Sequence, residues 1–281
     1  MNGTTDETKV DRFADVKAHF KEHGWAKIPA VLTKERAAQI VSRLWETAVT
    51  QESRGYRQFN PFMDPNTSNV RVWYQPEIHN IFEELTFNPV ALEMVEAALG
   101  ARPILSNFNV NIARPGSESM SLHSDQSLTY PSPWIHTWAA NALWCLTDIR
   151  EENGATRYLP GSHKYTTRQE IPPNAPELLR PFNADAGDLI IMSGALWHTS
   201  GLNRTKDEDR TVLFGYFVAP HLRPQVNWTS KISRNIQDNM TPEQRRVLCI
   251  DDMVDLSAEG DHRYLSKQYP DYVKAKESGA E

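Results

Sequence analysis

Apolar side chains in the first hundred residues recur every three to four positions, which is the spacing of one face of an α-helix. Two of these periodic stretches end at a glycine, Gly24 or Gly100, a common stop signal because glycine readily adopts the left-handed conformation. Thr33 precedes another stretch and is a good N-terminal cap. We therefore predict helices over residues 10–23, 33–51, 79–85 and 89–99, and a short strand over residues 25–29.

From residue 104 onwards the pattern changes to alternation and to short apolar runs separated by turn residues, as expected of β-strands. In the first run only Leu105 is out of step with the alternation. Helices first and seven or eight short strands afterwards indicate an α+β protein, mainly β, with a sandwich or jelly-roll core flanked by N-terminal helices. The predicted strands cover residues 104–112, 120–126, 138–149, 156–159, 187–192, 195–199 and 210–218. Residues 170–186 are predicted to be a proline-bearing loop, and a capped helix is predicted from Pro242 to about Cys249.

Two segments, residues 52–75 and residues 130–138, have no clear period and are rich in aromatic side chains. Long irregular segments inside a compact chain are often binding loops. A surface loop that packs its own aromatic side chains is an equally good interpretation. We interpret five side chains of these segments as candidate substrate-binding residues: Arg71, Trp73, Tyr130, Trp134 and His136.

A His-x-Asp pair lies in the predicted strand over residues 120–126. Because side chains alternate faces along a strand, His123 and Asp125 would point the same way and could occupy two neighbouring positions around a metal ion. His198, from a distant strand, could supply the third ligand. Two histidines and one carboxylate with open coordination positions suit a non-haem Fe(II) oxygenase. We therefore predict that these three side chains bind iron and form the catalytic centre.

An oxygenase of this kind needs two electrons besides O2, and 2-oxoglutarate can supply them while it chelates the iron through its keto acid. The distal carboxylate of this cosubstrate needs a basic partner, and a guanidinium can bind a carboxylate through two parallel hydrogen bonds. Arg210 opens the strand that follows His198, and pairing of the two strands would bring both side chains into one pocket. Ser200 could donate a hydroxyl to the same carboxylate. A surface ion pair is the simpler alternative for Arg210.

Asparagines stand at strand positions where other side chains are more usual. Asn109 and Asn111 lie, with Asn107, on the polar face of the strand over residues 104–112, where charged residues and threonine are commoner. They could line a wet pocket, or bond to neighbouring loops. Asn141 interrupts the apolar strand over residues 138–149.

Several motifs occur together in a recognisable order. They are HSD at 123–125, ENGATRYLPGSHK at 152–164 and GDLIIMSGALWHTSGLNRT at 187–205, followed by Arg210. Over about residues 10–222 the chain resembles the phytanoyl-CoA dioxygenase family of Fe(II)/2-oxoglutarate oxygenases. The resemblance implies a double-stranded β-helix core, which is a jelly roll of the cupin type. We expect one catalytic domain over residues 1–281, with mobile tails over residues 1–10 and about 268–281.

By the same likeness, Arg210 and Ser200 match the positions that hold the distal carboxylate of 2-oxoglutarate. Asn141, and Asn109 or Asn111, match polar positions near the cosubstrate. Met120 stands where fungal meroterpenoid members of the family have a glutamine, which argues against close kinship with them. Asp125 stands where halogenating members have alanine or glycine, which argues against halogenation.

Charge and composition limit which partners and which cellular location we expect for this protein. The chain has 30 basic and 36 acidic residues, and its net charge of −6 argues against nucleic acid or an anionic membrane as the main partner. It has no run of 18 apolar residues and no apolar N-terminal segment, so we expect neither membrane insertion nor a signal peptide. The two cysteines, Cys145 and Cys249, look like free thiols. We predict a soluble cytoplasmic protein with a small-molecule substrate, and homo-oligomerisation stays open.

These features together predict a dioxygenase that uses Fe(II), 2-oxoglutarate and O2. We expect it to hydroxylate an unactivated C–H bond of a small, largely apolar molecule, such as a natural product of secondary metabolism or a lipid, with release of succinate and CO2. Desaturation, epoxidation, cyclisation or endoperoxidation would use the same ligands. A non-catalytic cupin-fold binding protein and a metal-dependent hydrolase or isomerase are the alternatives from other classes, and neither needs the clamp of Arg210 and Ser200.

Overall fold

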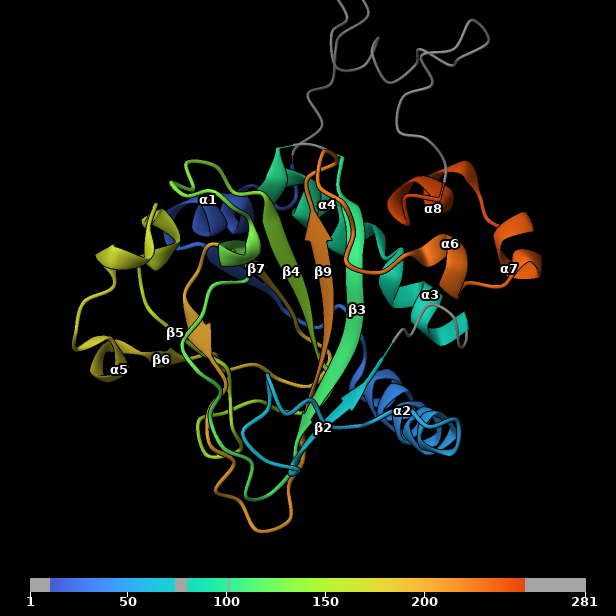
Figure 1. The fold of residues 1–281 in the computed structure, drawn as a ribbon, viewed down its shortest axis with the longest axis horizontal. Coiled ribbons are helices and arrows are strands. Elements are labelled where there is room, and N and C mark those ends of the chain that lie inside the picture. The colour runs from blue at the N-terminus through green and yellow to red at the C-terminus, as the bar shows by residue number, and fades with distance from the viewer. Residues whose placement is uncertain (1–10, 74–79, 101, 251–281) are drawn as a thin grey trace, which may run out of the picture.

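The computed structural model describes residues 11–73, 80–100 and 102–250, and both predicted tails therefore lie outside the described residues. A six-stranded antiparallel sheet occupies the centre of the molecule, a three-stranded antiparallel sheet lies beside it, and helices pack on the outside (Figure 1). None of the helices in these three ranges is long and apolar enough to cross a membrane. The predicted α+β class is confirmed.

The strands of the two sheets come from distant parts of the chain, in the orders β1-β7-β4-β9-β3-β2 and β6-β5-β8. The large sheet contains β1 (Trp25–Ile28), β2 (Asn69–Val72), β3 (Ile104–Ala113), β4 (Ala139–Cys145), β7 (Leu189–Ser193) and β9 (Arg210–Val218). The small sheet contains β5 (Arg157–Tyr158), β6 (Arg180–Pro181) and β8 (His198–Thr199). The α-helices are α1 (Ala14–His23), α2 (Lys34–Ser53), α3 (Asn80–Thr86), α4 (Pro89–Leu99), α5 (Ala175–Leu178), α6 (Trp228–Lys231), α7 (Arg234–Asp238) and α8 (Pro242–Val247).

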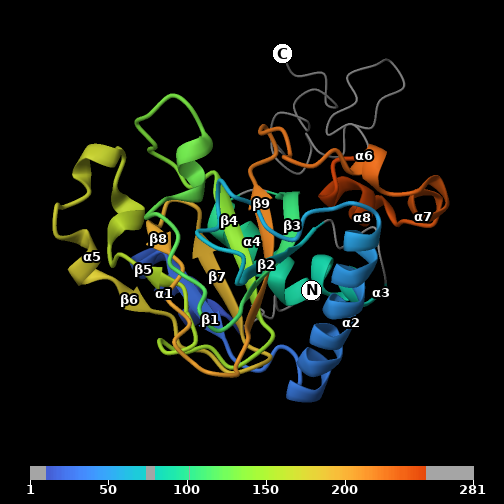
Figure 2. The ribbon, with the colours of Figure 1, turned by 60° about the horizontal axis from the view of Figure 1, so that its bottom comes forward.

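The two faces of the large sheet contact different layers, because side chains alternate along each strand. On β4, Ala142 and Trp144 belong to a core that they share with α2 and α4. Leu143 and Cys145 belong instead to a second cluster with Phe182, which follows β6. Figure 2 shows the small sheet on one side of the large sheet and α2 on the other. The space between the two sheets is therefore separate from the main apolar core.

A β-bulge in β3 explains why Leu105 is out of step in the sequence. The pairing of β3 with β9 shifts between Leu105 and Asn107. The extra residue lets Leu105 and Phe108 both reach the core shared with the helices. Beyond the bulge, Asn109 and Asn111 face the other side of the sheet and line a cavity.

The main helices end where the sequence signals predict. α4 covers residues 89–99, and Gly100 follows it in the left-handed conformation with φ 65°. The side chain of Thr33 caps α2 by accepting a hydrogen bond from the backbone N–H of Arg36. α1 begins at Ala14, later than predicted.

Two predicted strands are wrong in detail. Residues 120–126 form no strand, because the Ser124 hydroxyl and the Gln126 N–H both donate to the carbonyl of Gly194 and turn the chain into a short 3-10 helix, η2 (Asp125–Leu128). The strand predicted over residues 195–199 shrinks to β8, because a turn closed by Leu196 N–H and the Ser193 carbonyl precedes it.

Three segments are more regular than predicted. β2 lies within residues 52–75, and α5 and β6 lie within residues 170–186. α6 and α7 precede α8, which corresponds to the helix signal that starts at Pro242. Each of these elements is at most five residues long, too short to leave a clear period in the sequence.

Candidate active site

Three side chains from two separated parts of the chain form a candidate metal site. One ligand atom from each of His123, Asp125 and His198 lies within 4.8 Å of the others. Nε2 of His123 is 3.7 Å from Oδ1 of Asp125, and Nε2 of His198 is 3.9 Å from Oδ2 of the same carboxylate. Within the described part of the chain, no other group of histidine, cysteine and acidic side chains meets this geometry.

A β-bridge brings the two histidines together. The His123 N–H donates to the His198 carbonyl over 3.0 Å, and the His198 N–H donates to the His123 carbonyl over 2.8 Å. The chain then turns at Ser124, and Asp125 opens η2. The prediction that His123 and Asp125 share one face of a strand is therefore wrong, although both side chains reach the same cluster.

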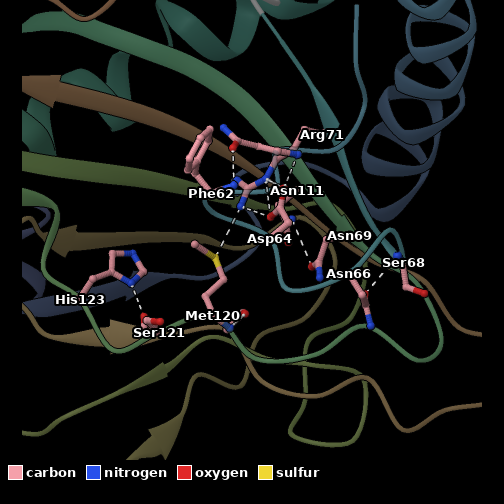
Figure 3. Close-up of polar contacts among 12 residues, drawn as sticks. Phe62, Asp64, Asn66, Ser68, Asn69, Arg71, Asn111, Met120, Ser121 and His123 are labelled. Carbon is pink, nitrogen blue, oxygen red and sulfur yellow. Dashed lines mark hydrogen bonds and ion pairs between the residues drawn. The ribbon is translucent and has the colours of Figure 1, made fainter.

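The backbone also selects the tautomer of each imidazole. Nδ1 of His123 lies 2.8 Å from the carbonyl oxygen of Ser121 (Figure 3), and Nδ1 of His198 lies 2.9 Å from that of Leu196. A carbonyl can only accept, so each Nδ1 carries the proton and each Nε2 lone pair faces the cluster. Burial, and next the repulsion that two protonated imidazoles would exert on each other, lower the pKa of His198 to about 4, so its ring is neutral at pH 7. Neutral imidazoles are the form that binds metal ions.

Two side chains of the large sheet surround Asp125. Nδ2 of Asn141 donates to Oδ2 of Asp125 over 2.6 Å, and the Tyr216 hydroxyl donates to the Asp125 backbone carbonyl over 3.4 Å. Burial and the nearby Asp125 charge raise the pKa of Tyr216, so its hydroxyl keeps the proton that it donates. The donor set therefore fits a divalent cation with open positions, such as Fe(II), whose carboxylate ligand is held by an amide. A contact of Asn141 with the cosubstrate stays a prediction.

The three candidate ligands open into a cavity of about 160 Å³ between the two sheets. The cavity is lined by Asn109 and Asn111 of β3, by Arg210 of β9 and by Ser200, which follows β8. All the predicted metal and cosubstrate residues, including Asn141, line this one space.

Arg210 reaches the cavity by a route other than the predicted hairpin. β8 pairs with β5 in the small sheet, whereas β9 lies between β4 and β3 in the large sheet, so His198 and Arg210 face each other from two sheets. The pairing predicted for these two strands is wrong. The two side chains meet because the sheets enclose the cavity between them.

Arg210 is a buried cation that has no acidic partner among the described residues. Only 1% of its surface is exposed, Nε donates to the Gly154 carbonyl over 3.0 Å, and Nη1 donates to Oδ1 of Asn111 over 3.1 Å. No carboxylate of the described residues lies within 4.0 Å of it, so the surface ion pair considered from the sequence is absent there. Burial, and next the charge of Arg71, lower its pKa to about 10, so it stays charged at pH 7. Because a buried charge is costly unless paired, this site fits an anionic ligand.

Ser200 lines the same cavity as Arg210 and is also buried. Its hydroxyl oxygen accepts a hydrogen bond from the backbone N–H of Met120 over 2.9 Å. The hydroxyl proton is therefore available to a ligand carboxylate.

The five candidate substrate residues occupy different surroundings. Arg71 lines the cavity and forms a buried ion pair with Asp64. Trp134 packs with an apolar cluster and donates through Nε1 to the Thr129 carbonyl. Trp73, Tyr130, Trp134 and His136 are not among the residues that line the cavity, and their roles stay predictions.

The cavity also has walls that the sequence analysis missed. Phe214 and Tyr216 lie four and six residues after Arg210 on the same face of β9, so alternation from Arg210 could have indicated both. Asn107, which shares the polar strand face with Asn109 and Asn111, also lines the cavity, and the remaining additions are Met63, Met120, Leu128, Thr156 and Gln225. Most of these come from loops, which carry no periodic signal.

Comparisons with known proteins agree with this geometry. The family model described as phytanoyl-CoA dioxygenase (PhyH) matches residues 20–212. The dioxygenase af480 of Aspergillus fumigatus is 50% identical over 256 residues, which cover 91% of this chain and 82% of af480.

Solved structures show a similar fold at low identity. The epimerase SnoN, crystallised with Fe3+, alpha ketoglutarate and nogalamycin RO, is 17% identical, with a TM-score of 0.58 over 81% of this chain and 90% of SnoN. HygX from Streptomyces hygroscopicus, with nickel and 2-oxoglutarate bound, is 18% identical, with a TM-score of 0.60 over 75% of this chain and 89% of HygX. These likenesses confirm the predicted double-stranded β-helix.

Proposed function

The chain belongs to the phytanoyl-CoA dioxygenase family and is an iron- and 2-oxoglutarate-dependent dioxygenase, and from this premise we propose that it hydroxylates an unactivated C–H bond of a small, largely apolar molecule such as a natural product or a lipid. The observation that carries the proposal is the shared cavity: the cluster of His123, Asp125 and His198 opens into the same space as the guanidinium of Arg210, which pairs with no carboxylate in the part of the chain that the structure describes. A hydrolase that only activates water on its metal would need no such cation.

We assign the iron to Nε2 of the two histidines and to the carboxylate of Asp125. Iron with 2-oxoglutarate and O2 supplies the oxidising power when bound, and the cosubstrate ends as succinate and CO2. The residues of this chain orient the ligands. The backbone carbonyls of Ser121 and Leu196 fix the imidazole tautomers, and the amide of Asn141 donates to one oxygen of the Asp125 carboxylate.

We assign the distal carboxylate of 2-oxoglutarate to Arg210 and Ser200. The contact between Nη1 of Arg210 and Asn111 fixes the plane of the guanidinium, and Nη2 has no partner among the described residues. A carboxylate placed there would neutralise the buried charge and accept a charge-assisted hydrogen bond. It would also accept the Ser200 hydroxyl proton. Asn111 thus supports the cosubstrate through Arg210, while a direct role of Asn109 stays a prediction.

The cavity walls away from Arg210 favour an uncharged substrate. Met63 and Leu128 line the cavity and are exposed, 74% for Leu128, so two apolar side chains lie at its mouth. Asn107 and Gln225 share a hydrogen bond of 3.0 Å, and both line the cavity. A substrate with an apolar body and a neutral polar group matches this combination of walls.

The deciding experiment measures succinate formation with Fe(II), 2-oxoglutarate, O2 and a library of neutral terpenoids, polyketides and lipids. We expect turnover that requires the metal and the cosubstrate, and a product that gains one oxygen atom. Activity without metal, or without 2-oxoglutarate, would contradict the proposal. Loss of two hydrogen atoms from the product would instead indicate desaturation or ring closure. Mass analysis matters here because the neighbouring structures include an epimerase, SnoN, and a carbocyclase, SnoK.

A further inference from the structure

Two buried arginines face the cosubstrate cavity, but the described residues supply only one carboxylate that pairs with either. Arg71 on β2 and Arg210 on β9 both line the cavity. Nε and Nη2 of Arg71 donate hydrogen bonds to the Asp64 carboxylate over 3.0 Å and 2.7 Å, and both side chains are buried (Figure 3). This two-pronged contact uses one edge of the Arg71 guanidinium. Its Nη1 has no hydrogen-bond partner among the described residues.

Asp64 also organises the turn that carries the cavity mouth. Its Oδ2 accepts from the backbone N–H of Asn60 over 3.1 Å, and its own N–H donates to the Asn60 carbonyl over 2.8 Å. Residues 60–64, which we call the mouth turn, present Phe62 to solvent at 98% exposure and place Met63 in the cavity wall. One carboxylate therefore holds both the mouth turn and Arg71.

Charge balance relates this ion pair to the cosubstrate. With only Asp64 present, Arg71 and Arg210 repel each other, and the charge of Arg71 contributes to the lowered pKa of Arg210. A carboxylate bound between the two guanidinia would give an alternating order of charges: Asp64, Arg71, the ligand and Arg210. Each buried charge then has a neighbour of opposite sign, which strengthens the contacts of Arg71.

We propose that Asp64 is a positioning residue that links the mouth turn to the cosubstrate end of the cavity, so that binding of 2-oxoglutarate closes the turn over the site. The inference rests on the proposed function, because it requires 2-oxoglutarate at Arg210. Closure would exclude water before the substrate is oxidised.

Chymotrypsin cleavage after Phe62 reports opening of the mouth turn, because a protease cuts a folded segment only when it opens locally. The full chain is digested with Mn2+ in place of iron, with and without 2-oxoglutarate, and mass spectrometry identifies the cut between Phe62 and Met63. We expect 2-oxoglutarate to slow this cut by about five-fold or more in the wild type. In Asp64→Asn the cut should be faster and change less than about two-fold when 2-oxoglutarate is added.

The control variant Glu84→Gln removes the carboxylate of an exposed pair with Arg36 and should keep the full protection. If Asp64→Asn does not fold, the double variant Asp64→Asn/Arg71→Gln removes both charges and should show the same loss. Calorimetric titration of 2-oxoglutarate into each protein separates the two hypotheses. Absence of binding to the wild type would overturn the proposed function. Binding with equal protection in wild type and variant would overturn the role of Asp64 alone.

Discussion

The two ends of the cavity are built in different ways. At the inner end, Arg210, Asn111 and Asn141 stand on long strands of the large sheet, and each makes defined hydrogen bonds. At the mouth, Met63 and Leu128 come from a turn and from the end of η2, and both are exposed. The difference teaches that the sheet positions the iron and cosubstrate chemistry, whereas loops decide which substrate enters.

Removal of an iron ligand should abolish iron binding and catalysis at the inner end of the cavity. His198→Ala leaves two ligands, so we expect loss of bound iron and of all turnover. Metal content after gel filtration and succinate formation measure the two effects. His221→Ala, which changes an exposed histidine, should retain both. A metal-free His198→Ala protein that still turns over would refute the assignment.

Loss of the buried cation should weaken the binding of 2-oxoglutarate and leave iron binding intact. Arg210→Met keeps the bulk of the side chain but removes the charge, and we expect the apparent KM for 2-oxoglutarate to rise roughly 100-fold. Iron binding should stay unchanged. Arg204→Met alters an exposed arginine of the same segment and serves as the control. An unchanged KM in Arg210→Met would place the distal carboxylate elsewhere.

The hydrogen bond to Asp125 should tune iron affinity. Asn141→Leu removes the donor to Oδ2 of Asp125, and we expect iron to bind about 10–100-fold more weakly. Titration of Fe(II) under anaerobic conditions measures the affinity. Asn109→Leu changes an amide of the same cavity that does not touch the carboxylate, so its iron affinity should match wild type. Equal affinities in all three proteins would show that Asn141 acts on another step.

Changes at the mouth should have the smallest effects and spare the chemistry. Leu128→Asp puts a charge on the apolar wall, so the KM of the identified substrate should rise about ten-fold while the KM for 2-oxoglutarate stays constant. Tyr130→Ala should change either value less than about two-fold, because Tyr130 is 92% exposed and does not line the cavity. A large effect of Tyr130→Ala would restore the substrate-binding role predicted from the sequence.

Local signals in the chain predicted several elements to the residue. α4 and β9 have the predicted ends, because Gly100 stops the helix and a run of mostly β-branched, aromatic and other apolar residues marks the strand. Leu105 broke the alternation of β3, and the bulge beside it is the cause. Such features depend on neighbours in sequence, which a pattern can record.

By itself, the sequence determined the class of fold, the three candidate ligands and Arg210 as the cation, since hydrophobic periodicity and the residue types of the motifs can be recognised along the chain. Only the tertiary structure decided how they meet: His198 and Arg210 lie on different sheets, Asp125 begins a 3-10 turn, and Asp64 pairs with Arg71. The physical reason is that these contacts depend on how two sheets and their loops pack together. No periodicity along the chain shows which residues this packing brings together.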